Sequence, residues 1–220
     1  MSPVRINKYE KVRARMVQEQ LIPRGIENHA VLDAMSTVPR HLFTEDALHA
    51  QAYGDFPLPI GHGQTISQPY VVALMTQLLD LKGQEKVLEI GTGCGYQSAI
   101  LASLCEKVYT VERIKPLLAR TRRTFDQLHL FNIISKIDDG TAGWPEHAPF
   151  DAIIVTAAGP QIPQPLIDQL ADPGSMVLPV GDAERQTLMF VRKENGEVST
   201  TPVESVRFVK LVGIHGWQAA

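Results

Sequence analysis

Between Lys86 and Gly181 the sequence alternates short apolar runs with amphipathic stretches, and this alternation constrains the fold more than any other feature. The apolar runs are KVLEI, KVYTVE, ISKID, DAIIVTAA and GSMVLPVG. The stretches QSAILASLC, IKPLLARTRRTFDQL and PQPLIDQL between them are typical of helices. Strands that alternate with helices form βαβ units, whose right-handed crossovers build a buried parallel sheet. The sequence therefore predicts an α/β fold with five parallel strands.

Both ends of the chain depart from this alternation. Two β-rich runs flank Asn195 and Gly196, a dipeptide typical of tight hairpin turns, so antiparallel strands are expected at the C-terminal end. The first 50 or so residues have helical periodicity broken by Pro23 and Pro39, and a further helix is expected over Val71–Leu81. We expect a single domain over residues 1–220, made of a helical cap (1–57), a lid segment (58–70) and an α/β core (83–220).

Composition excludes several classes of protein. The chain has 220 residues, 44% hydrophobic and 20% charged, which suits one well-buried globular core. The net charge is -3 and basic residues form no long block, which argues against binding of nucleic acid. No N-terminal leader pattern and no apolar run long enough to span a bilayer is visible, so no membrane association is expected.

Cysteines and histidines bear on location and metal binding. Cys94 and Cys105 would lie too far apart along a helix to form a disulfide, so both are expected to be thiols, which suits a cytoplasmic protein. Neither HxxxH nor CxxC occurs, so no metal site is expected. Nothing in the sequence indicates an obligate protein partner.

The stretch VLEIGTGCGYQSAI places Gly91, Thr92, Gly93 and Gly95 between the first core strand and a helix. In a parallel sheet this is where the backbone can approach a nucleotide-like ligand. The dinucleotide fingerprint is GxGxxG, whereas the spacing here is GxGxG, with Glu89 two residues ahead. A carboxylate there is poorly placed for a pyrophosphate and well placed for a sulfonium or ammonium group. The pattern favours S-adenosyl-L-methionine over NAD.

Two further carboxylates follow the next strands of the predicted sheet. Glu112 ends the second strand, from which a carboxylate can accept hydrogen bonds from both ribose hydroxyls. Asp139 ends the third strand beside Gly140, where it could accept a hydrogen bond from an adenine amino group. Any one of these residues could be an ordinary solvated loop residue, but together with the glycines they strengthen the prediction of S-adenosyl-L-methionine.

Seven stretches, in order and spacing, resemble the protein-L-isoaspartate O-methyltransferases. They are LPIGHGQTISQP, VLEIGTGCGYQSAILA, VERI, DDGTAGWPEHAPFDAIIVTAA, IPQPLIDQL, VLPVG and VRFVKL. The glycine loop alone is generic to class I methyltransferases, and its combination with GQTISQP is specific to this family. The resemblance implies a Rossmann-like class I methyltransferase sheet, mostly parallel with antiparallel C-terminal strands, plus the N-terminal helical cap.

The resemblance also implies an activity and its residues. Such enzymes methylate the free α-carboxylate of L-isoaspartyl residues in damaged proteins and peptides, and the ester reverts through a succinimide, which repairs the chain. Ser67 matches the residue assigned to catalysis, and Gln64, Thr65 and Ile66 match the segment over the cofactor. The residues that match the cofactor site are Gly91, Gly93, Gly95, Glu112, Asp139 and Gly140. Asp138 stands where a glycine is usual, and Lys210 where a proline is usual.

The composition of the lid segment suits this chemistry. A carboxylate nucleophile is already ionised at pH 7 and needs no general base. The protein's task is to align the carboxylate with the sulfonium methyl group and to exclude water. Ser67 is therefore expected to orient the substrate carboxylate. It could instead, or in addition, cap the helix that begins near Pro69.

Three other functions fit parts of the pattern. A DNA amino-methyltransferase would need [DN]PP[FY] after the fourth strand, where this chain has TAAGP. A small-molecule carboxyl methyltransferase and a non-catalytic S-adenosylmethionine-binding module remain alternatives that transfer of methyl to an isoaspartyl peptide would distinguish.

The segment Ser205–Leu211, SVRFVKL, is expected to be a strand that pairs with the substrate backbone, or a strand without substrate contact.

Overall fold

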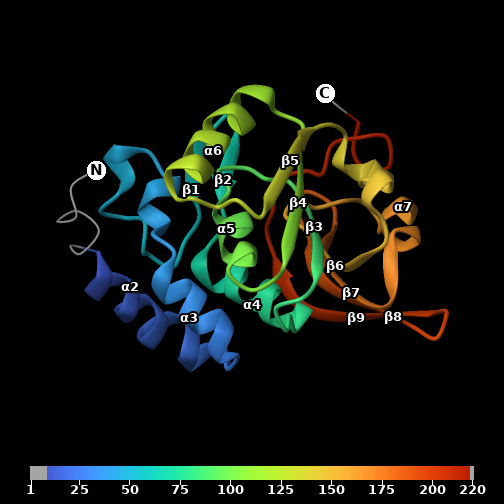
Figure 1. Ribbon diagram of the computed structural model, residues 1–220, viewed down its shortest axis with the longest axis horizontal. Helices are drawn as coiled ribbons and strands as arrows, with labels where there is room; N and C mark the ends of the chain where they lie inside the picture. The colour runs from blue at the N-terminus through green and yellow to red at the C-terminus, as the bar shows by residue number, and fades with distance from the viewer. Residues whose placement is uncertain (1–8, 219–220) are drawn as a thin grey trace.

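The computed structural model describes residues 9–218 and contains a seven-stranded sheet with helices on both faces (Figure 1). The strand order is β5-β4-β3-β6-β7-β8-β9, in which the first five are parallel and the last two antiparallel. The strands are β3 (Lys86–Ile90), β4 (Lys107–Glu112), β5 (Ile133–Ile137), β6 (Phe150–Val155), β7 (Leu170–Gly181), β8 (Gln186–Glu194) and β9 (Glu197–Val206). The predicted α/β fold, with five parallel strands and antiparallel C-terminal strands, is confirmed.

The inner strands β3, β4 and β6 are buried on both faces, and their successive side chains point to opposite sides of the sheet. In β3, Val87 packs with the apolar cluster beneath α4 and α5, and Leu88 and Ile90 pack with the opposite cluster. Helices α4 (Pro69–Leu79), α5 (Tyr96–Ala102) and α6 (Lys115–Gln127) lie on one side of the sheet. Helix α7 (Gln164–Asp168) and the short turns η5 (Gly140–Ala142) and η6 (Pro145–His147) lie on the other (Figure 1).

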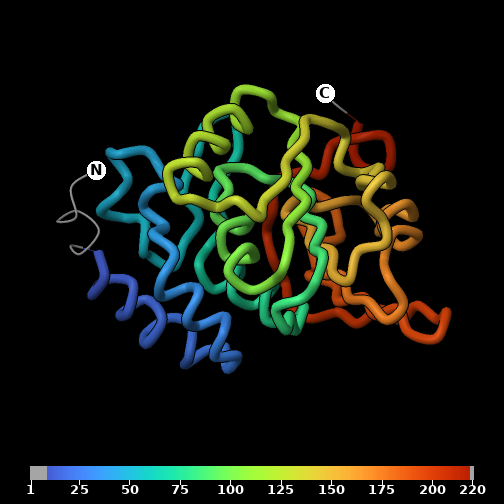
Figure 2. The backbone as a smooth tube through the Cα atoms, viewed as in Figure 1, coloured from blue at the N-terminus to red at the C-terminus, as the bar shows by residue number. Residues whose placement is uncertain are grey.

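The cap packs against α4 and α5, at the far end of the molecule from the β8–β9 hairpin (Figure 2). Its helical elements are α2 (Glu10–Met16), η1 (Val17–Leu21), η2 (Ile22–Arg24), α3 (His29–Thr37), η3 (Arg40–Phe43) and η4 (Asp46–Leu48). The predicted helical cap is present from Glu10 onward, and residues 1–8 and 219–220 lie outside the described residues. Within the described residues, no helix is both long and apolar enough to cross a membrane.

Two predicted boundaries differ from the structure. The helix expected over Val71–Leu81 is α4 (Pro69–Leu79). It begins two residues earlier because proline suits the first helical position, and it ends at Leu79 because Asp80 adopts the left-handed conformation. The lid segment, for which no strands were predicted, contains a two-stranded antiparallel ribbon of β1 (Leu58–Gly61) and β2 (Gln64–Ile66). Its turn is formed by His62 and Gly63, both at positive φ. The hairpin predicted at Asn195-Gly196 joins β8 to β9.

Candidate active site

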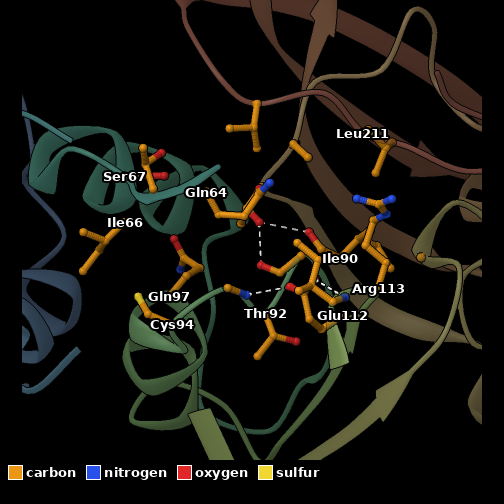
Figure 3. Close-up of a pocket in the computed structure, with 18 of the residues that line it drawn as sticks. Gln64, Ile66, Ser67, Ile90, Thr92, Cys94, Gln97, Glu112, Arg113 and Leu211 are labelled. Carbon is orange, nitrogen blue, oxygen red and sulfur yellow. Dashed lines mark hydrogen bonds between the residues drawn. The ribbon is translucent and has the colours of Figure 1, made fainter. Parts of the chain in front are cut away.

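A cavity of about 910 Å³, partly open to solvent, lies at the C-terminal ends of β3, β4 and β6 (Figure 3). From β3 the chain continues to β4, its neighbour on one side, and it later returns to form β6 on the other side of β3. The crevice between β3 and β6 is therefore a topological switch point of the sheet. Gly91 after β3, Glu112 at the end of β4 and Thr156 after β6 line it.

The glycine loop forms the floor of this cavity. Gly91, Thr92 and Gly93 line it, and Gly93 has φ 55° at a position where a side chain would come within 3.6 Å of Ile60 in the lid. Gly95 does not line it, because it begins α5 at φ 88° and a side chain there would overlap with Phe125 and Thr121 of α6. The loop therefore carries no side chain at Gly91 and Gly93 along the cavity, and it packs closely against α6 at Gly95.

Glu112 is the carboxylate that lies in the cavity wall. Its Oε2 accepts a hydrogen bond from the Gly93 amide at 2.9 Å, and its Oε1 accepts one from the Ile114 amide at 2.9 Å (Figure 3). A carboxylate has about four lone-pair sites, so each oxygen can accept a further bond. The two backbone amides thus fix the carboxylate while leaving it able to accept two ligand hydroxyls.

Glu89 lies below the cavity rather than in its wall. Alternation along β3 puts its side chain on the same face as Val87, toward α5, where Ser98 and Thr110 (2.6 Å) donate hydrogen bonds to its Oε2. Complete burial raises the pKa of Glu89 to about 8, which favours the neutral form of the group at pH 7. It supports the loop through Thr110, whose hydroxyl lies 2.7 Å from that of Thr92. The expected contact between a Glu89 carboxylate and a cationic ligand does not fit this geometry.

Asp139 is tied to the C-terminal segment. Its Oδ1 accepts hydrogen bonds from the amide (2.9 Å) and hydroxyl (2.7 Å) of Thr141, and its Oδ2 accepts one from the Ile214 amide at 2.7 Å. Gly140 lines the cavity beside Leu211 and Val212, whereas Asp139 does not. Of the two residues predicted at the adenine end, Gly140 therefore lies in the cavity wall, and Asp139 anchors the C-terminal segment.

The β1–β2 ribbon forms the lid side of the cavity. Gln64, Thr65 and Ile66 line it, and Ile66 packs with Leu58 and Ile60 in the core shared with the cap. Arg120 of α6 donates a hydrogen bond to the Ile60 carbonyl at 2.6 Å, which holds β1. The three predicted lid residues are therefore brought beside the glycine loop by a short ribbon and apolar packing.

Ser67 follows the ribbon and lines both this cavity and a second, larger one. Helix α4 begins after Gln68 without a side-chain cap, so the alternative that Ser67 caps this helix is wrong. Its backbone carbonyl accepts a hydrogen bond from Arg40 at 2.7 Å. Within residues 9–218 the Ser67 hydroxyl has no hydrogen-bond partner, which leaves it available to a ligand (Figure 3).

The second cavity, about 1600 Å³ and partly open, shares Thr65, Ser67, Thr156 and Val209 with the first. Arg24 of the cap contributes one wall, where its guanidinium lies 3.3 Å from the centre of the Tyr70 ring and within 3.9 Å of Glu204 of β9. The rest of that wall runs from Glu204 to Val209. A wide, mixed polar and apolar space therefore opens directly onto Ser67.

The segment Ser205–Leu211 forms part of both cavities but is not one strand. Strand β9 ends at Val206, because the Gln186 side chain binds both the amide (2.6 Å) and the carbonyl (3.1 Å) of Phe208. Beyond it, Val209 and Leu211 bond to Ala158, with Lys210 as an isolated parallel bridge. The expectation of a continuous strand is wrong past Val206.

Several residues of the site escaped the sequence reasoning. The Thr156 hydroxyl lies within hydrogen-bond distance of the carbonyls of Ile90 (3.1 Å) and Gly91 (2.7 Å). Gln97 and Arg113 also line the first cavity. The position of Thr156, directly after the strand that neighbours β3, was the signal that could have found it. Across residues 9–218, no group of three or more His, Cys, Asp or Glu side chains could hold a metal ion.

The family described as protein-L-isoaspartate(D-aspartate) O-methyltransferase (PCMT) matches residues 12–216, nearly the whole chain. The chain belongs to this family. Relatives named protein-L-isoaspartate O-methyltransferase include one from Desulfotalea psychrophila, 54% identical and covering 97% of this chain and 100% of its own, and one from Geobacter metallireducens, 57% identical with 95% and 97% covered.

Solved structures agree with the family. One described as a protein-L-isoaspartate O-methyltransferase has a TM-score of 0.84 and 26% identity, and covers 93% of this chain and 67% of its own. Another, from Plasmodium falciparum and described in complex with S-adenosyl-L-homocysteine, has a TM-score of 0.79 and 25% identity over 91% and 98%. The predicted activity, that of a protein-L-isoaspartate O-methyltransferase, is confirmed. The predicted class I methyltransferase fold and the cofactor S-adenosyl-L-methionine are confirmed as well.

The geometry also fits that cofactor. The cavity offers a glycine loop without large side chains, a fixed carboxylate at Glu112 and an uncharged lid of Gln64, Thr65 and Ile66. A ligand with ribose hydroxyls, such as S-adenosyl-L-methionine, matches the carboxylate of Glu112.

Proposed function

We propose that this methyltransferase carries out its repair reaction where the two cavities meet, with the cofactor in the smaller and the damaged peptide in the larger. The observation that carries the proposal is that Thr65 and Ser67 line both cavities. The second cavity is larger than the first and extends from Ser67 to β9 and the cap, which favours a peptide segment over a small carboxylic acid. Cap, lid and core then act as one unit over residues 1–220, because each supplies a wall.

S-adenosyl-L-methionine would be held by Glu112 at the ribose, by Gly91, Thr92 and Gly93 at its centre, and by Gly140 at the adenine end. Gln64, Thr65 and Ile66 cover it, while Glu89, Gly95 and Asp139 support these elements from behind. When bound, the cofactor supplies a sulfonium methyl group as the electrophile. All remaining functions belong to the chain: alignment of the two reactants and exclusion of water.

Ser67 orients the isoaspartyl carboxylate through its free hydroxyl. The carboxylate is ionised at neutral pH and needs no proton removed, so a neutral donor suffices. A cation in this place would stabilise the separated reactants more than the transition state, in which both charges diminish. Thr65 and Ile66, the two lid residues before Ser67, carry no charge. The lid is therefore in keeping with this requirement.

The peptide backbone pairs with the chain at Lys210. Val209 and Leu211 direct their bonding groups to Ala158, so the amide and carbonyl of Lys210 point away from it. Within the described residues neither group forms a backbone hydrogen bond. An extended peptide that binds these groups is held independently of its side chains, as a repair enzyme with many substrates requires.

The substrates are isoaspartyl-containing proteins and peptides in the cytoplasm, with no nucleic acid, membrane or obligate protein partner needed. The cytoplasmic location is supported by Cys94 and Cys105, which are both free thiols in the structure.

Substitution of Ser67 by alanine tests the proposal. We expect turnover on an isoaspartyl peptide to fall while the affinity for S-adenosyl-L-homocysteine and the melting temperature stay close to those of the wild type. A variant that keeps full turnover would remove Ser67 from the reaction.

A further inference from the structure

Arg40 is a fully buried cation at the point where cap, lid and core meet. It belongs to η3, is 0% exposed, and ranks among the largest fully buried side chains of the described residues. Its guanidinium carbon lies 4.8 Å from the centre of the Tyr96 ring, at the start of α5. Tyr96 itself lines the cofactor cavity.

The Arg40 guanidinium has no carboxylate partner among the described residues. Its Nε donates to the Ala52 carbonyl at 2.6 Å, its Nη2 donates to the Ser67 carbonyl at 2.7 Å, and its Nη1 is buried without a hydrogen-bond partner in that part of the chain. Burial of a charge without an opposite charge is unfavourable and is rarely retained in a core. A purely structural link between two carbonyls does not require a charged group, so a buried arginine at this place has a functional reason.

The geometry of the bonds indicates that reason. The planar fork of arginine holds two acceptors on separate segments in a fixed geometry, whereas the three donors of lysine radiate from one freely rotating atom. One acceptor belongs to the cap, and the other is the carbonyl of the residue whose hydroxyl borders both cavities. We propose that Arg40 is a positioning residue that fixes the backbone of Ser67, and through it the Ser67 hydroxyl, against the substrate carboxylate.

This inference rests on the proposed role of Ser67 and extends it to a residue that touches neither substrate nor cofactor. Arg40 holds the end of the lid from the cap side, as Arg120 holds β1 from α6. The Ser67 carbonyl is thereby tied directly to the cap. A shift of Ser67 by about 1 Å is enough to lower a rate by roughly a hundredfold where alignment is the main contribution.

The test uses Arg40→Lys and Arg40→Met, with Arg13→Lys as the matched control. Arg13 is also a buried arginine of the cap, but it bonds to the Ser36 carbonyl (2.9 Å) and the Tyr53 hydroxyl (3.5 Å) and does not contact the lid. For each variant we would measure the melting temperature, the affinity for S-adenosyl-L-homocysteine, and kcat and KM on an isoaspartyl peptide. The Met variant buries no charge, so it provides folded protein where a misplaced lysine would not.

We expect both Arg40 variants to lower kcat by about tenfold to a hundredfold with unchanged cofactor affinity. Arg13→Lys, even if equally destabilised, should keep the kcat of the wild type. In the Ser67→Ala background, Arg40→Lys should lower kcat no further, because both act through one hydroxyl.

Three results would overturn the inference: wild-type kcat in the Arg40 variants, an equal loss of kcat in Arg13→Lys, or failure of both Arg40 variants to fold, which would make Arg40 a residue of the fold. Additive losses of kcat in the double variant would contradict it as well. Failure of the Ser67 proposal gives a different pattern, since Ser67→Ala alone would then be fully active.

Discussion

At the scale of single residues, the site separates three acidic side chains that look alike in the sequence. All three lie near the C-terminal end of a core strand. Glu112 is the last residue of β4, Glu89 is the last but one of β3, and Asp139 follows the end of β5. Only Glu112 faces the cavity, since strand alternation turns Glu89 toward α5 and the C-terminal segment occupies Asp139. The surroundings of each carboxylate therefore decide its role.

Replacement of Glu112 by alanine should weaken binding of S-adenosyl-L-homocysteine. Loss of a charged hydrogen-bond acceptor for the ribose costs about 1.5–3 kcal/mol, which is at least roughly a tenfold loss of affinity. Glu112→Gln keeps one acceptor oxygen, so its affinity for S-adenosyl-L-homocysteine should lie between those of the wild type and Glu112→Ala. Calorimetric titration measures all three proteins, and equal affinities would exclude Glu112 from the cofactor site.

Glu89 should make the stability of the protein decrease with rising pH. Its pKa is raised by burial from the ordinary value of 4.5 to about 8, so between these pH values the folded protein holds a proton that the unfolded chain has released. The contribution is complete below about pH 4.5 and is lost as pH rises toward about 8. In Glu89→Gln, which cannot titrate, the melting temperature should fall less between pH 5 and about pH 8 than in the wild type. Parallel curves for the two proteins would show that Glu89 does not titrate in this way.

At the scale of elements, the site is closed by two segments that are too short or irregular to be evident from the sequence. Strands β1 and β2 have four and three residues and contain Pro59 and Gly61, so their alternation is too brief to predict a ribbon. The Arg207–Leu211 segment is β-rich in sequence, but the Gln186 side chain takes the bonds that a neighbouring strand would make. Local pattern identifies long buried strands reliably, whereas tertiary contacts decide these short pieces.

Pairing of the peptide at Lys210 predicts a specific kind of substrate preference. Methylation of the amide nitrogens that flank the isoaspartyl residue removes main-chain donors, and it should raise KM several-fold or more. Replacement of the neighbouring side chains by others of similar size should have a smaller effect, because the groups at Lys210 recognise backbone. Steady-state kinetics on a matched set of peptides checks this, and a series in which only side chains matter would contradict strand pairing.

At the scale of the whole molecule, the core was predictable and the connections between cap and site were not. The alternation from Lys86 onward and the spacing of Gly91, Gly93 and Gly95 indicated both the parallel sheet and the place of the cofactor. Arg40 could not be identified in the same way, because an arginine in VPRHLF looks like a surface residue until the fold buries it. Its partners lie 12 and 27 positions away in the chain, beyond any local pattern.

The central claim is that the junction of the two cavities transfers methyl groups to isoaspartyl carboxylates. Its most direct test is incubation of the purified protein and methyl-labelled S-adenosyl-L-methionine with an isoaspartyl peptide and with its aspartyl twin of the same sequence. Label should enter the isoaspartyl peptide as an ester and be absent from the twin. Equal labelling of both peptides, or binding of S-adenosyl-L-homocysteine with no transfer to either, would contradict the account.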